Sequence, residues 1–211
     1  LLVLGRVAWL RLPGRHMAWW LGTDVRSVVV FDACVLYPAP MRDFLIRIAT
    51  AGLFAAKWTD RIHDEWTRNL LAQRPDLAGA LERTRSLMDH AVHDCLVEGY
   101  EPLIEGLSLP DPDDRHVLAA AIRAGAQSIV TINLKDFPAS SLAPYGIEAV
   151  HPDTFVEQQL DLHEGAVVTT AKRHRGALRN PPKSVDEYLE TLAAQGFVVT
   201  ADRLRQFADV L

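Results

Sequence analysis

The sequence predicts an α/β fold with a mostly parallel central sheet, and three observations lead to that prediction. Short apolar runs alternate with segments of helical periodicity along residues 28–150. The first run, Val28–Phe31, is β-branched and aromatic until it meets the charge of Asp32, which is typical of a strand buried on both faces. Right-handed crossovers between such strands place the loops that follow them along one edge of the sheet. Asp32 and Asp136, each just past an apolar run, are therefore expected at that edge.

Three elements are expected between the first strand and residue 75. The prolines within 33–40 predict a loop, which leads into a helix that ends near Gly52. A second strand is expected over 54–58. Thr59 or Asp60 can then cap the helix that begins near Arg61.

The remainder of the α/β region repeats this alternation. A helix is expected to restart at Pro75, and the apolar residues within 94–97 predict a third strand. The last signals are a helix over 114–124 that stops at Gly125, followed by strands over 128–132 and 147–150.

Residues 151–211 show helical patterns only, so we expect a helical C-terminal extension packed on the sheet domain. Its four helices are predicted by the following signals: Asp153 as the cap of 154–160, an apolar periodicity over 163–178, a capping box of Ser184 with Glu187 before a helix that stops at Gly196, and Thr200 as the cap of the last helix.

The first 27 residues are expected to form an N-terminal extension outside the native fold. Arginines interrupt its apolar stretches, which fall short of the ~20 residues that span a bilayer. The segment also lacks the ordered regions of a secretion signal, and Met17 could be the true initiator. We therefore expect no membrane association.

The composition is that of one globular domain with a modest acidic balance. A chain of 211 residues can bury one substantial core, and its net charge of −5 argues against a protein that coats DNA. Cys34 and Cys95 stand far apart without a second pair, which excludes a disulfide framework or a zinc motif and favours the cytoplasm.

Four acidic residues stand where the fold could bring them to one site: Asp32, Glu65, Asp114 and Asp136. Carboxylates gathered without a cation would raise one another's pKa. A hard divalent ion removes that conflict, so the pattern predicts Mg²⁺ or Mn²⁺. The simpler interpretations are a surface pair of Glu65 with Arg61 or Arg68, and a turn at Asp136 before Pro138.

Four segments resemble, in order, the motifs of PIN domains, the nucleases that include the VapC toxins of toxin–antitoxin pairs. They are the run from Val29 through Asp32 to Pro38, the helix with Glu65, the segment from Asp111 through Asp114 to Ala121, and the run from Ile129 through Asp136 to Phe137. The resemblance covers about residues 28–150. The prolines Pro181 and Pro182 before a capped helix resemble a C-terminal extension of one bacterial VapC subgroup.

This resemblance implies a three-layer α/β/α sandwich and a metal-dependent endoribonuclease, which hydrolyses RNA through a metal-activated water. It also implies a cognate antitoxin and a homodimer. The implied roles are direct metal binding by Asp32 and Asp114, direct or water-mediated binding by Asp136, holding or deprotonation of the water by Glu65, and orientation of waters or phosphate by Thr131 and Asn133.

The chain departs from the family pattern at two places. Asn133 stands where many PIN domains carry an aspartate, which leaves Asp136 as the available carboxylate. Asp113 and Asp114 compete for one role, and we favour Asp114 because it is in register with Val117 on its helix, while Asp113 is expected to cap that helix.

A basic stretch near the C-terminus predicts an RNA contact. No acid occurs between Glu164 and Asp186, whereas Lys172, Arg173, Arg175 and Arg179 all fall there. Such cations contact a phosphate backbone without reading its sequence. The alternatives are a solvated helix face or a surface for an acidic partner.

Other classes of protein fit less well. A phosphoaspartate enzyme needs a second aspartate where this chain has Cys34, and a response-regulator receiver needs an acidic pair near its first strand. Cys34 lacks a positioned base and is not expected to be a nucleophile. The serious alternative is a catalytically inactive PIN-like module that binds RNA or protein, because Asn133 weakens the fourth motif.

Overall fold

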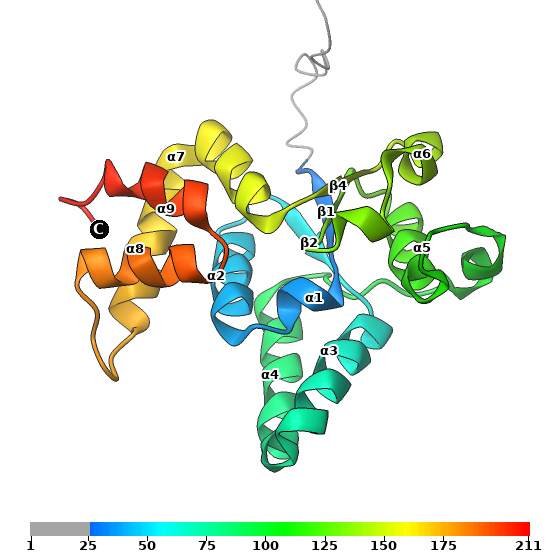
Figure 1. Cartoon of the computed structure of the whole chain (residues 1–211), viewed down its shortest axis with the longest axis horizontal. Helices are drawn as coiled ribbons and strands as arrows, with labels where there is room; N and C mark the ends of the chain where they lie inside the picture. Colours follow the sequence, from blue (N-terminus) through cyan, green and yellow to red (C-terminus); the bar gives the residue numbers. More distant parts are fainter. Residues whose placement is uncertain (1–25) are drawn as a thin grey trace, which may run out of the picture.

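The computed structural model describes residues 26–211, in which four parallel strands form one sheet with helices on its two faces (Figure 1). The strand order is β2-β1-β3-β4. The predicted N-terminal extension, residues 1–27, lies outside the described residues except for its last two. The strands are β1 (Val28–Phe31), β2 (Ala55–Lys57), β3 (Ser128–Val130) and β4 (Glu148–Val150).

The predicted helices occur in the expected order along the chain, and α1 and α6 are additions to them. Those of the N-terminal half are α1 (Ala33–Leu36), α2 (Ala39–Thr50), α3 (Asp60–Gln73) and α4 (Ala78–Ala91). They are followed by α5 (Arg115–Ala124), α6 (Ala139–Leu142), α7 (Pro152–Ala177), α8 (Val185–Ala194) and α9 (Val198–Arg205). Short 3-10 turns complete the fold: η1 (Pro75–Leu77), η2 (Glu101–Gly106), η3 (Pro112–Asp114), η4 (Leu134–Asp136) and η5 (Ala143–Tyr145).

The central strand β1 joins the sheet to the C-terminal extension. Its neighbours are β2 and β3, and Phe31 pairs in register with Val130. The ring of Phe31 is fully buried and meets Phe54 edge-on at 6.0 Å and Phe155 of α7 at 6.5 Å. The extension therefore begins against the core of the sheet domain, and α7 continues across α2.

Two predictions in the first half of the chain are wrong. The expected loop over 33–40 contains α1, which starts directly after the strand because the Asp32 side chain accepts a hydrogen bond from the backbone N–H of Ala33. The strand expected over 94–97 is a single bridge between Trp58 and Leu96. Asp94 interrupts it, because its φ of 56° lies in the left-handed region and breaks extended backbone.

Capping around α5 also differs from the expectation. Asp113 makes no cap, whereas Asp111 accepts a 2.9 Å hydrogen bond from the N–H of Asp113 and starts the η3 turn that precedes α5. A 3-10 turn thus takes the place of the predicted first helical turn. Gly125 ends α5 with a φ of 63°, as predicted.

The extension confirms its expected helices but corrects two caps. The helices predicted over 154–160 and 163–178 are one element, α7, broken at His163. Asp153 does not cap its own helix: its carboxylate accepts 2.9 Å hydrogen bonds from the N–H groups of Val199 and Thr200 and so caps α9. Thr200 lies inside α9 and is not a cap, because Asp153 takes that role from another helix.

The third helix of the extension is capped as predicted. Ser184 and Glu187 form the reciprocal capping box before α8. Within residues 26–211, none of the helices combines the length and the apolar character that crossing a membrane requires.

Candidate active site

Asp32 lies at the carboxyl end of β1, where a parallel sheet presents its ligand sites. Its side chain is buried, with an exposed fraction of 3% for the residue. One oxygen, Oδ1, accepts a 2.6 Å hydrogen bond from the N–H of Ala33. The other, Oδ2, accepts hydrogen bonds from the hydroxyl of Thr131 at 2.7 Å and from the thiol of Cys34 at 3.1 Å. The carboxylate is therefore held by residues that follow β1 and by Thr131, which follows β3.

Thr131 and Cys34 form the support behind Asp32. Thr131 is fully buried, and its hydroxyl also accepts a 3.0 Å hydrogen bond from the N–H of Asn133. The sulfur of Cys34 accepts a 3.2 Å hydrogen bond from the N–H of Ile132. The single hydroxyl proton of Thr131 goes to Asp32, so this residue orients the carboxylate. Its predicted role toward a water or phosphate stays a prediction.

Burial has the largest effect on the pKa of Asp32. It raises the pKa of Asp32, and the charge of Glu65 adds to that effect, while the hydrogen bonds from Thr131 and Cys34 lower it. Burial, followed by the charge of Asp32, raises the pKa of Cys34 to about 12. The thiol is therefore protonated at neutral pH and acts as a donor, so Cys34 does not provide a thiolate nucleophile.

Asp114 is the predicted acid on which the charges of the other three act. It ends η3 immediately before α5 and is partly buried. Burial, followed by the charges of Asp32, Asp111, Asp136 and Glu65, raises its pKa to about 7. The fold thus brings Asp32, Glu65 and Asp136 into electrostatic range of Asp114, from elements far apart in sequence.

Glu65 faces this group from α3, and its partner is a residue that the sequence analysis did not select. Its Oε2 lies 3.4 Å from Nε2 of His116 on α5. The simpler interpretation, a surface pair with Arg61 or Arg68, is therefore wrong. The Glu65 side chain keeps 31% of its surface exposed, which leaves it accessible to water.

Asp136 is held by the short turn after β3. Its N–H donates a 3.0 Å hydrogen bond to the carbonyl of Asn133, and the buried ring of Phe137 anchors the turn. Asn133 is exposed and Asp136 partly buried. The amide of Asn133 carries no charge, whereas the charge of Asp136 raises the pKa of Asp114.

The donor chemistry of this group fits a hard divalent cation. Its side chains offer carboxylate oxygens, which Mg²⁺ and Mn²⁺ prefer, and their mutual repulsion is the kind of conflict that a cation relieves. In the part of the chain that the structure describes, however, no three His, Cys, Asp or Glu side chains converge closely enough to hold an ion. An ion bound through few direct ligands and retained water suits this spacing better than a closed cage.

Comparison with known proteins identifies the fold family. Residues 28–135, about half of the chain, match a family model described as a PIN domain. The chain belongs to the PIN domain family. Residues 152–206 match a second model, the VapC50 C-terminal domain, and this range covers α7, α8 and α9 in full. No solved structure matches this chain.

A relative in Mycobacterium tuberculosis (strain ATCC 25618 / H37Rv) carries the name Putative ribonuclease VapC50. It is 44% identical over 108 residues, a match that covers 50% of this chain and 63% of the relative. The matched region is therefore less than two thirds of that relative.

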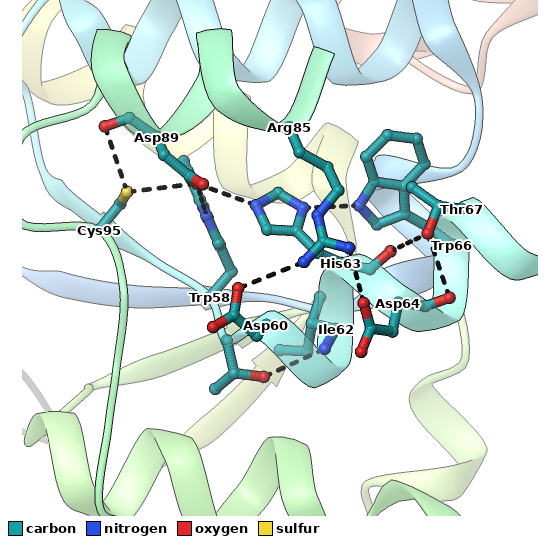
Figure 2. A network of polar contacts seen from close by, with 11 residues as sticks. Trp58, Asp60, Ile62, His63, Asp64, Trp66, Thr67, Arg85, Asp89 and Cys95 are labelled. Atoms are coloured by element: carbon teal, nitrogen blue, oxygen red, sulfur yellow. Dashed lines mark hydrogen bonds and ion pairs between the residues drawn. The ribbon is translucent and has the colours of Figure 1, made fainter. Parts of the chain in front are cut away.

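A second polar network holds the helix that carries Glu65 (Figure 2). Oδ1 of Asp89 on α4 accepts hydrogen bonds from the indole of Trp58 at 2.8 Å and from Nε2 of His63 at 2.9 Å. Nδ1 of His63 in turn accepts a 3.0 Å hydrogen bond from the indole of Trp66. Because Trp58 and Trp66 are fully buried, as predicted, this network fixes α3 of the PIN domain against β2 and α4.

The predicted RNA-binding cations divide into two pairs. The amine of Lys172 donates a 2.8 Å hydrogen bond to the carbonyl of Val210, and the guanidinium of Arg175 binds the main-chain oxygens of Leu211 and Lys183. These two side chains thus hold the end of the chain. Arg173 and Arg179 are exposed. Lys172, Arg173 and Arg175 belong to the C-terminal half of α7. Figure 1 shows that half on the opposite side of α2 from α5.

Proposed function

We propose that this PIN protein is a divalent-metal-dependent endoribonuclease and the toxin of a VapBC-type toxin–antitoxin pair. The observation that carries the proposal is the effect of the other predicted acids on Asp114, whose pKa burial and their charges raise to about 7. Carboxylates so arranged at the end of β1 are costly to the fold unless a cation uses them.

The proposed roles follow from the contacts of each carboxylate. Asp32, oriented by Thr131 and Cys34, and Asp114 would hold a Mg²⁺ or Mn²⁺ ion, with Asp136 adding a direct or water-mediated ligand. A bound divalent ion supplies positive charge to phosphate oxygens and lowers the pKa of water. Glu65, which remains accessible to water, would accept the proton of the attacking water.

Substrate and partner rest on the family and on the surface. The VapC50 relative is named as a ribonuclease, which supports RNA as the substrate class. The exposed Arg173 and Arg179 suit a phosphate backbone, and Asn133 is exposed beside the carboxylates, where its amide can orient a water or a phosphate oxygen. A cognate antitoxin, a homodimer and a cytoplasmic location belong to the same proposal.

One observation favours the alternative function, an inactive PIN-like module that binds RNA or protein. Among residues 26–211, no three His, Cys, Asp or Glu side chains lie close enough together to hold a metal ion. The two functions differ in whether a metal ion binds and whether RNA is cut.

The deciding experiment is cleavage of total cellular RNA by the purified protein in EDTA, Mg²⁺ or Mn²⁺, with Mn²⁺ binding measured by calorimetry. Asp32→Asn and Asp114→Asn are expected to abolish both cleavage and ion binding. Asp113→Asn is the matched control, because this exposed neighbour of Asp114 should leave both intact. A wild type that neither binds Mn²⁺ nor cuts RNA would establish the binding module.

A further inference from the structure

Three histidines are buried in residues 26–211, and they differ in how their ring nitrogens are used. Both nitrogens of His63 have partners, Asp89 and Trp66. Both nitrogens of His174 also have partners, since Nδ1 lies 3.1 Å from the hydroxyl of Tyr188 and Nε2 lies 3.2 Å from Oδ2 of Asp43. These two side chains link helices. His116 differs, because only its Nε2 faces a polar group.

The unpaired nitrogen of His116 makes this residue costly as a packing element. His116 is 2% exposed, and its Nδ1 is buried without a hydrogen-bond partner within the described part of the chain. A buried polar atom without a partner destabilises a fold, and an apolar side chain of similar size would avoid that cost. Packing alone therefore does not account for a histidine at this position.

The other ring nitrogen of His116, Nε2, contacts a residue of the proposed active site. Nε2 lies 3.4 Å from Oε2 of Glu65, so one side chain connects α5, which follows Asp114, with α3, which carries the proposed acceptor of the water proton. A carboxylate only accepts hydrogen bonds, so Nε2 is the ring nitrogen that can donate a proton to Glu65. Contacts of this length at catalytic groups commonly shorten when substrate binds.

We propose that His116 is a positioning residue that aims the Glu65 carboxylate at the attacking water. This role rests on the proposed nuclease function. His116 itself does not touch RNA, because its side chain is buried. Its effect is on the orientation of Glu65 and therefore on the rate of the chemical step, with no effect on RNA binding.

Three substitutions separate this role from packing. The amide nitrogen of Gln reaches the place of Nε2, whereas that of Asn reaches only the place of Nδ1. We expect His116→Phe and His116→Asn to lower kcat about 10- to 100-fold at unchanged KM, and His116→Gln to restore most of kcat. Equal losses in all three, or a loss confined to KM, would overturn the role.

His174→Phe is the matched control for burial of a histidine. It removes two polar contacts between helices, so we expect a lower Tm with kcat within about twofold of wild type. If His174→Phe lowered kcat as much as His116→Phe and the two variants had the same Tm, the loss at position 116 would be an effect of stability alone.

A measurement that needs no activity keeps this inference separate from the nuclease proposal. In ¹⁵N spectra of the imidazoles, His116 is expected to show a protonated Nε2 and a bare Nδ1. Its Nε2 signal should shift in Glu65→Gln but not in Asp113→Asn. The opposite tautomer, or a signal that ignores Glu65→Gln, would overturn the contact even in an active enzyme. An inactive wild type with the expected spectra would overturn the nuclease function and, with it, the catalytic role of His116.

Discussion

The hydroxyl of Thr131 donates a 2.7 Å hydrogen bond to Oδ2 of Asp32, and this bond ties together the ends of two neighbouring parallel strands. Phe31 of β1 and Val130 of β3 are paired in register, so the next residue on each strand meets the other at the edge of the sheet. The position of Asp32 is thereby set by sheet register as well as by its own rotamer. Any ion at this site depends on that register.

Removal of this hydrogen bond should weaken ion binding. Thr131→Val leaves the buried Asp32 with one donor fewer, and because that bond lowers the pKa of Asp32, its loss makes the ionised form harder to reach. We expect Mn²⁺ affinity to fall about 10- to 100-fold by calorimetry. Thr131→Ser keeps the hydroxyl and should stay near wild type; equal affinity of the Val and Ser variants would show that the bond is not needed.

Asp114 should make the metal-free protein less stable as pH rises. Its pKa is raised from 3.8 to about 7 in the folded state, so between those values the unfolded chain releases a proton that the folded protein retains. The contribution of this group is therefore favourable at low pH and is lost as pH rises through about 7. In EDTA, Asp114→Asn should raise Tm at pH 8 by about 2 °C or more and change it little at pH 4.

The control for this pH effect is again Asp113→Asn. Asp113 is exposed, and substitution there should leave the difference in Tm between pH 4 and pH 8 as in wild type. A stabilisation by Asp114→Asn that is equal at both pH values would indicate a packing effect and would contradict the electrostatic account.

The sheet and the place of the acids were accessible to sequence reasoning because their signals are local. Four apolar residues followed by Asp32 predict both a buried strand and a charge at its end. The capping box of Ser184 is confined to four residues, and Gly125 at the end of α5 is a single-residue signal. The division of the chain after residue 150 stays a prediction.

Contacts between distant residues were not accessible in this way. Nothing near Asp153 in sequence shows that its carboxylate caps α9, and nothing near His116 shows that Glu65 faces it. Asp94 adopts a left-handed backbone that its neighbours do not signal, so the apolar pattern around it predicted a strand wrongly. Side chains such as Thr131 were selected by motif, but their partners depend on tertiary geometry.

The cap that Asp153 provides should be essential to the extension. Asp153→Ala leaves two N–H groups of α9, including that of the fully buried Thr200, without their acceptor. We expect a loss of about 2 kcal/mol in the free energy of unfolding, measured with urea. The control is Asp161→Ala, which removes the surface partner of Arg203 and should cost less than about 1 kcal/mol. Similar losses in both variants would reject the capping role.

The two pairs of C-terminal cations should differ in what their loss affects. Arg173→Ala with Arg179→Ala removes exposed charge, so we expect weaker RNA binding, a smaller salt dependence and an unchanged Tm. Lys172→Ala with Arg175→Ala removes the donors to the last two residues, so we expect a lower Tm and release of the buried Leu211. Filter binding at several salt concentrations and thermal unfolding measure both effects. RNA binding that is unchanged in the first double variant would leave this basic face without a part in RNA binding, and the carboxylate edge of the sheet would then have to position the substrate without it.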